Sequence, residues 1–166
     1  MNRMKQIADA IWTSKVRYCI ALYANICVKP TDPKSKAMKD LQIAQNKVLR
    51  LLTGHRRTDR KSIKDMLEET GFSSINQMAA ETMLFETWKN INIPGAPLKS
   101  FLNKMVGNSY GTRATERGDL QEDGASKCLW NQAAKLWNKT SPLIRKAESI
   151  PQVKREIKKY VKMLPI

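Results

Sequence analysis

Basic residues gather over a short stretch in the first half of the chain. Eight residues that could contact an anion fall within positions 47–64: Lys47, Arg50, His55, Arg56, Arg57, Arg60, Lys61 and Lys64. An arginine in a loop can direct two N–H donors onto the oxygens of one phosphate. The cluster therefore predicts a phosphate-binding surface, in which His55 would assist the contacts. The alternative is a run of charge that is only solvated.

A second basic group lies near the C-terminal end. Its members are Lys154, Arg155, Lys158, Lys159 and Lys162. Apolar residues recur between them at three- and four-residue steps, so a helix there would turn its apolar side inward and these five residues outward. The group is a second, weaker candidate for anion binding, and a solvated terminal helix is the alternative.

The sequence offers little for catalysis. A two-metal polymerase or nuclease needs carboxylates that converge on one site, but the adjacent acidic pairs, Glu68-Glu69 and Glu122-Asp123, follow no apolar strand. His55 is the only histidine, and its arginine neighbours disfavour the protonated form that a base must take up. No phosphate-cradling glycine loop occurs, and Cys19, Cys27 and Cys128 lack zinc-ligand spacing. We predict a chain that is not an enzyme and has neither metal nor cofactor.

Net charge supports a polyanionic partner. The 166 residues include 30 Lys or Arg and 15 Asp or Glu, for a formal charge of +15. Residues 1–64 have a net charge of +11, residues 65–140 of −1 and residues 141–166 of +5. Basic ends around a neutral middle indicate nucleic acid, and less often an acidic membrane surface. No apolar window is long enough to span a membrane, so we expect no membrane insertion.

Apolar spacing predicts the helices that must position these charges. The first covers residues 4–28 and the second residues 34–53, with Leu51 on its apolar stripe and Gly54 at its end. A short helix follows from residue 63 and ends at Gly71. Ser74 and Gln77 form a capping-box pattern that opens the next helix, and the tryptophans lie on or beside apolar stripes, which favours the core over base stacking.

The fold class expected is therefore all-α, an irregular bundle of about five to seven helices. Glycine and proline interrupt residues 92–124, which predicts a loop or hinge. Helical spacing returns after residue 125, with Ser141-Pro142 and Ser149 as helix starts. The expected organisation is a helical region over residues 1–91, the 92–124 loop, and a helical tail over residues 125–166. The odd number of cysteines favours a reducing, intracellular compartment, cytoplasmic or nuclear.

Several short motifs, in order along nearly the whole chain, resemble the region after the polymerase palm in non-LTR retrotransposon reverse transcriptases. Residues 14–18 (SKVRY) and 41–54 (LQIAQNKVLRLLTG) resemble that family's SKLRYG and LQ..QNKALR.ITG patterns. Further similar elements are residues 74–77 with Trp88-Lys89, Thr112-Arg113, residues 133–144, and the basic ending at residues 147–162.

The resemblance implies a helical thumb and tail that hold template–primer nucleic acid. The family's catalytic Asp-Asp turn, its fingers, its endonuclease domain and the Cys/His knuckle of some members are absent from this sequence, so no catalytic residue carries over. We therefore expect a non-catalytic module that binds RNA, DNA or a hybrid through phosphates. The alternatives are a fragment for protein interaction or self-association, with the missing palm and fingers as possible partners, and a retroelement relic without a selected function.

Overall fold

The computed structural model describes residues 3–18, 20, 26, 35–96, 99, 102, 117–122 and 128–165. These residues form helices and contain no strand, which confirms the all-α prediction with about seven helices. Most of the predicted 92–124 loop lies outside this set. The chain forms two compact units, residues 1–79 with 164–166, and residues 80–163. The two units are defined by contacts between residues. The division expected from the composition of the sequence, into residues 1–91, 92–124 and 125–166, stays a prediction.

The first helical segment of unit 1 is not one regular α-helix. Its described part consists of α1 (Arg3–Ala8), the π-helical η1 (Asp9–Thr13) and α2 (Ser14–Arg17). The spacing predicted one helix over residues 4–28; Ile20 is helical again, and most of residues 19–28 lie outside the described residues. Tyr18 leaves the helical region with ψ 117°. The Ser14 hydroxyl donates to the carbonyl oxygens of Ala10 and Ile11, a bond typical of a locally distorted helix.

Not all of the predicted apolar stripe on this segment is buried. Val16 is buried, as the spacing predicted, but Ile7 and Ile11 remain 56% and 55% exposed. Periodicity marks which residues share a face, but only the neighbouring helices decide how much of that face is covered. Cys19 and Tyr23, which belonged to the same predicted stripe, lie outside the described residues.

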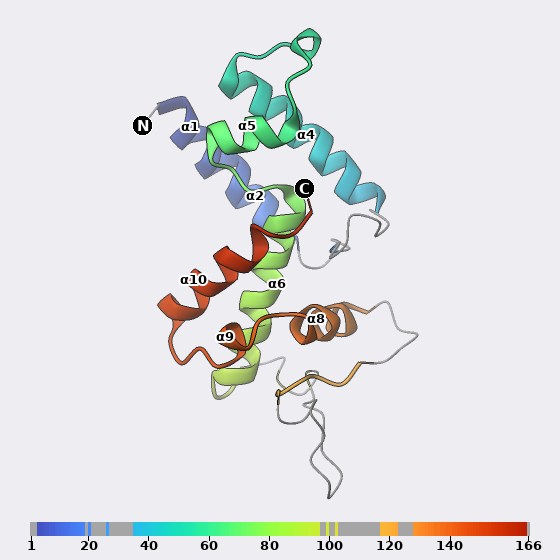
Figure 1. Ribbon diagram of the computed structural model, residues 1–166, viewed down its shortest axis with the longest axis vertical. Helices are drawn as coiled ribbons and strands as arrows, with labels where there is room; N and C mark the ends of the chain where they lie inside the picture. The colour runs from blue at the N-terminus through green and yellow to red at the C-terminus, as the bar shows by residue number, and fades with distance from the viewer. Residues whose placement is uncertain are drawn as a thin grey trace, which may run out of the picture. The chain divides into compact units, whose positions relative to one another are not determined.

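Helices α4 (Lys36–Thr53) and α5 (Ile63–Thr70) pack against each other, and α1 also packs against α4 (Figure 1). Helices α4 and α5 both end at a glycine in the left-handed region, as predicted: Gly54 has φ 71° and Gly71 has φ 69°. Gln45, inside α4, is fully buried, and its amide donates to the Ser73 carbonyl oxygen at 2.7 Å. This bond fastens the segment after α5 onto α4. Leu51, predicted to face the core, is 72% exposed, and Leu49 is buried instead.

Helix α6 (Ile75–Asn92) begins with the predicted capping box. The Gln77 N–H donates to Ser74 Oγ at 3.2 Å, and the Ser74 N–H donates to Gln77 Oε1 at 3.0 Å. Residues 75–79 belong to unit 1 and the rest of the helix to unit 2. Trp88 is buried, as expected, and its indole N–H donates to the Ala147 carbonyl oxygen at 3.0 Å.

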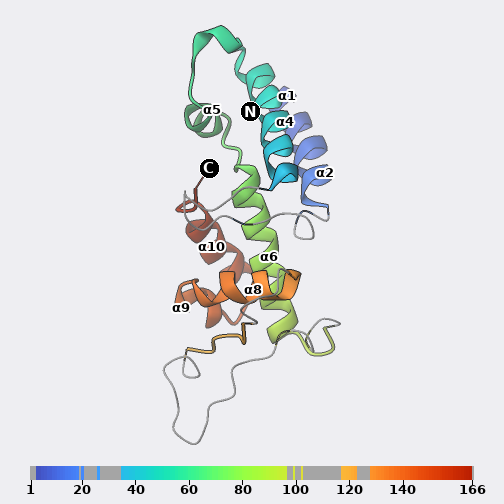
Figure 2. The same cartoon turned by 90° about the vertical axis from the view of Figure 1, so that its right-hand side faces the viewer.

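In unit 2, helices α8 (Leu129–Asn138), α9 (Pro142–Arg145) and α10 (Ile150–Val161) surround the later turns of α6 (Figure 2). The predicted caps form: Ser141 Oγ accepts from the Leu143 N–H and Ser149 Oγ from the Gln152 N–H. The Arg145 guanidinium pairs with the Asp119 carboxylate and donates to the carbonyl oxygens of Asn138 and Arg117.

We predict that Arg145→Met strongly destabilises unit 2. Both side chains of the Arg145–Asp119 pair are only 7% exposed, so removing the guanidinium leaves a buried carboxylate without its main partner, a loss of about 3–5 kcal/mol. Arg117 contacts the same carboxylate at 2.9 Å but is 60% exposed, so Arg117→Ala is the matched control, with an expected loss below about 1 kcal/mol. Urea unfolding measures both; equal losses would contradict the central role of Arg145.

Candidate functional site

The predicted basic cluster surrounds the connection between α4 and α5, residues 54–62. In Figures 1 and 2 this connection projects from the ends of the two helices. Gly54 ends α4, one turn of 3₁₀ helix, η2 (Arg57–Asp59), fills the middle, and Arg60 follows in the left-handed region with φ 51°. Ser62 then starts α5 by accepting a hydrogen bond from the Asp65 N–H at 3.1 Å. The tight turns bring basic residues together at one end of unit 1.

The backbone of Arg56 is held on both sides. Its carbonyl oxygen accepts from Arg50 Nη1 at 2.9 Å, and its N–H donates to Asp59 Oδ2 at 2.6 Å. The Arg50 guanidinium thus braces the loop from the last turn of α4, and its contact with phosphate stays a prediction. The peptide units before and after the Arg56 Cα thus each have a charge-assisted hydrogen bond. These bonds fix the loop backbone from which the Arg56 and Arg57 side chains emerge.

Lys61, His55 and Glu69 form a second internal contact. The Lys61 ammonium pairs with the Glu69 carboxylate and lies 2.8 Å from His55 Nε2. Because an ammonium can only donate, Nε2 accepts in this contact. Nδ1 lies 3.8 Å from Asp59 Oδ2. The hydrogen bond from Lys61, followed by the positive charge of the same ammonium, lowers the pKa of Glu69.

Five members of the predicted cluster remain directed outward. They are Lys47, Arg56, Arg57, Arg60 and Lys64. All five side chains are exposed, and none pairs with an Asp or Glu within the described part of the chain. The structure thus divides the eight candidates: Arg50, His55 and Lys61 hold the loop together, and the other five present charge to solvent.

The N-terminus of α5 follows the loop, and a helix N-terminus can attract an anion, but this one is less suited to that role. The Ser62 hydroxyl already accepts from the Asp65 N–H, and the Asp65 carboxylate lies in the first helical turn. A negative side chain at this position satisfies the helix dipole itself and repels a second anion. The five outward cations therefore carry the candidate site.

The second basic group lies in unit 2, with four members on α10 and Lys162 directly after its last residue. Of its five members, Arg155 and Lys159 pair with Glu156, at 3.4 Å and 3.0 Å. Lys158 and Lys162 are exposed and form no ion pair with a carboxylate that the structure describes. The Lys154 ammonium lies over the ring of Phe85 on α6. Sequence reasoning did not connect α6 to this group, because Phe85 and Lys154 are far apart along the chain.

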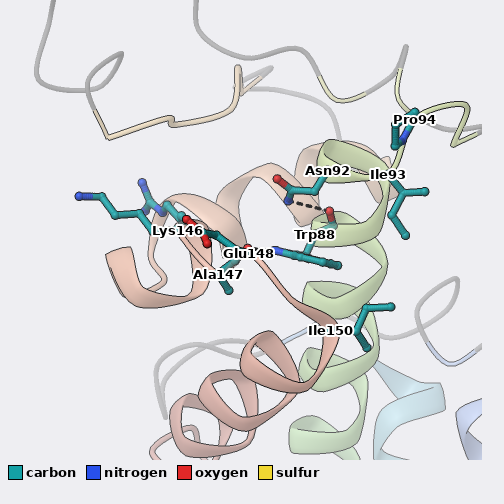
Figure 3. A pocket seen from close by; sticks show the side chains of 9 residues that line it. Trp88, Asn92, Ile93, Pro94, Lys146, Ala147, Glu148 and Ile150 are labelled. Carbon is teal, nitrogen blue, oxygen red and sulfur yellow. Dashed lines mark hydrogen bonds between the residues drawn. The ribbon is translucent and has the colours of Figure 1, made fainter.

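A cavity of about 520 Å³ lies elsewhere in unit 2, beside Trp88 (Figure 3). Ile93, Pro94 and Ile150 supply apolar wall, and Lys146 and Glu148 add opposite charges at its edge. The Asn92 amide donates to the Trp88 carbonyl oxygen at 2.9 Å, and the lining Arg145 is occupied by Asp119. Asn92 and Arg145 are thus already used within the protein. No group of three or more potential metal ligands occurs among residues the structure describes.

We predict that Glu69→Gln destabilises the protein at neutral pH and has a smaller effect in acid. The folded-state pKa of Glu69 lies below its ordinary value of 4.5, so its contribution is present above that value and is lost as the pH falls through the folded pKa. Thermal melts at pH 7 and pH 3 measure this difference. Glu68→Gln, at the preceding residue of the same helix, is the control. Equal melting temperatures for the two variants at pH 7 would contradict the Lys61–Glu69 contact.

Comparisons with known proteins identify no relative. The chain matches no protein-family model, no curated protein and no solved structure. Among the helices described, none combines the length and apolar character that crossing a membrane requires. Any assignment of function must therefore rest on the site itself.

Proposed function

We propose that this chain is a non-catalytic module that binds the phosphate backbone of nucleic acid through the loop after α4. The observation that supports this most is the set of five outward cations, Lys47, Arg56, Arg57, Arg60 and Lys64, around a loop fixed from inside. Phosphate contacts supply most of the sequence-independent affinity for nucleic acid. Three arginines in one short loop also suit bidentate contacts to phosphate oxygens.

The internal bracing of the loop favours binding over simple solvation. Since Arg50 and Asp59 fix the backbone of Arg56 at 2.9 Å and 2.6 Å, less conformational freedom is lost when an anion is bound. The resemblance to the region after a reverse-transcriptase palm agrees with this role and points to an RNA–DNA template–primer as the ligand. On this proposal, palm and fingers domains are protein partners, and the compartment is intracellular, cytoplasmic or nuclear.

We predict that the chain binds an RNA–DNA hybrid with a strong dependence on salt. If four to six phosphates are contacted, affinity falls by about two to three powers of ten between 50 and 200 mM salt, because bound counterions are released. The double variant Arg56→Ala/Arg57→Ala should weaken binding to all sequences alike and lower the log–log salt slope by about 2. Gel-shift titrations on two hybrids of unrelated sequence measure both effects.

The matched control removes two charges from the other end of the same helix. Lys36 and Lys39 are exposed in the first turn of α4, which places them roughly 25 Å from the loop along a helix of eighteen residues. Lys36→Ala/Lys39→Ala should retain most of the affinity. Absence of binding at low salt, salt-independent binding, or an equal loss in the control would each overturn the proposal.

Protein interaction is a second candidate function, and an exposed apolar row favours it. Met4, Ile7 and Ile11 follow each other at three- and four-residue steps on α1 and η1, so they share one face. Each is at least half exposed, at 52%, 56% and 55%. Adjacent apolar side chains of this size on a surface are typical of contacts with another polypeptide.

We predict that self-association, if it occurs, depends on this row. Light scattering at several concentrations measures the mass, and Ile7→Asn/Ile11→Asn should shift any dimer to monomer because it removes two of the three exposed apolar side chains of the row. Leu143→Asn, at a position 62% exposed on α9, is the control. A clean monomer that binds the hybrid tightly would favour the first function.

A further inference from the structure

Helix α10 presents only polar side chains to solvent over its middle turns. Val153, Ile157 and Val161 are all buried, and their side of the helix packs into unit 2. The remaining sides carry Lys154, Arg155, Lys158, Lys159 and Lys162. A helix whose apolar side is already covered cannot insert that side into a lipid surface. Its outer surface is therefore suited to a charged, hydrophilic partner.

The basic residues of this helix form two rows, one that pairs with Glu156 and one that does not. The Glu156 carboxylate accepts from Lys159 and Arg155, and these contacts, that of Lys159 first, lower its pKa. Arg155 and Lys159 are thus partly neutralised. The other row consists of Lys154, Lys158 and Lys162 at steps of four residues, which places successive lysines about 6 Å apart along one helical face.

Phe85 connects this row to a lysine of α6. The ammonium groups of Lys154 and Lys89 lie 5.0 Å and 5.2 Å from the centre of its ring. Each distance is within the range of a cation–π contact, so one aromatic side chain holds two cations from different helices. Lys89 also pairs with Glu86 at 2.7 Å. The ring limits the side-chain freedom of Lys154 at the end of the row, where a flexible lysine would lose entropy on binding.

We propose that α6 and α10 of unit 2 form a second nucleic-acid surface, in which Lys154, Lys158 and Lys162 contact successive phosphates and Phe85 positions Lys154 beside Lys89. Charge complementarity selects the partner: a row of three lysines fits a regularly spaced polyanion, and the buried apolar side of α10 argues against a membrane. This inference goes beyond the proposed function, because it concerns other residues in the other unit and does not require the loop after α4 to bind.

The experiment compares two variants of equal charge on the same helix. Lys158→Gln/Lys162→Gln removes two members of the row, and Arg155→Gln/Lys159→Gln removes the two cations paired with Glu156. In gel-shift titrations of the full chain on an RNA–DNA hybrid at 50 mM salt, we expect about a tenfold loss of affinity for the first and less than about threefold for the second. The salt slope should fall by about 2 only for the first.

The role of Phe85 has its own test at constant charge. Phe85→Leu should weaken binding by about two- to fivefold through loss of the cation–π contacts, with circular dichroism as the check on folding. Phe85→Met serves the same purpose if leucine disturbs the packing. Affinity equal to that of the parent chain in a folded Phe85 variant would overturn the positioning role.

Three results would overturn the second surface as a whole. One is an equal loss of affinity in the two double variants of α10, which would mean that binding responds to net charge alone. Another is no loss in Lys158→Gln/Lys162→Gln. A third is binding to phosphatidylcholine–phosphatidylserine vesicles that depends on Lys158 and Lys162 while hybrid binding does not. If affinity falls in Arg56→Ala/Arg57→Ala but not in Lys158→Gln/Lys162→Gln, the proposed function stands and the second surface does not. If affinity falls only in Lys158→Gln/Lys162→Gln, the second surface alone is supported.

Discussion

Repulsion among cations is the constraint under which this chain folds. Thirty Lys and Arg side chains accompany fifteen Asp and Glu, so at least half of the cations cannot have a carboxylate of their own. The structure meets this shortage by sharing. Glu69 contacts Lys61 and His55, Asp119 contacts Arg145 and Arg117, and Glu156 contacts Lys159 and Arg155. Shared carboxylates lower the repulsion where the chain must be compact, and they leave other cations at the surface.

Burial decides how much each shared carboxylate matters for stability. The Asp119–Arg145 pair is almost fully removed from water, and Arg145 also satisfies backbone carbonyl oxygens around it. A charge in this position must keep its partner, because water cannot replace it. Glu69 and Glu156 are closer to solvent, and their contacts chiefly select which neighbouring cations remain free. One type of interaction thus serves packing in one place and charge placement in another.

The two basic surfaces share a design, although they belong to different units. In each, some of the cations are used within the protein: Arg50 and Lys61 brace the loop, and Arg155 and Lys159 pair with Glu156. Among the cations left over, Arg56 has its backbone fixed by Arg50 and Asp59, and the Lys154 ammonium lies over an aromatic ring. A fixed arrangement of charge binds a polyanion at lower entropic cost than the same number of freely moving side chains.

The helical class, most helix starts and ends, and the position of both basic groups follow from the amino-acid sequence alone. Gly54, Gly71 and the Ser74–Gln77 capping box act through bonds and dihedral angles within a few residues, and local rules read such features well. Apolar spacing also placed Val16, Trp88 and Val153 in the core. The same spacing misplaced Ile7, Ile11 and Leu51, because a stripe defines a face but not the helix that covers it.

Which cations remain available to bind an anion depends on how the chain folds. Composition could not show that Arg50 turns back onto the Arg56 carbonyl oxygen, or that Lys61 reaches Glu69 on the next helix. Nor could it join Phe85 to Lys154, which meet only after α6 and α10 pack. Charge along a chain is fixed by residue type, whereas the field at a surface depends on distances between groups that folding alone brings together.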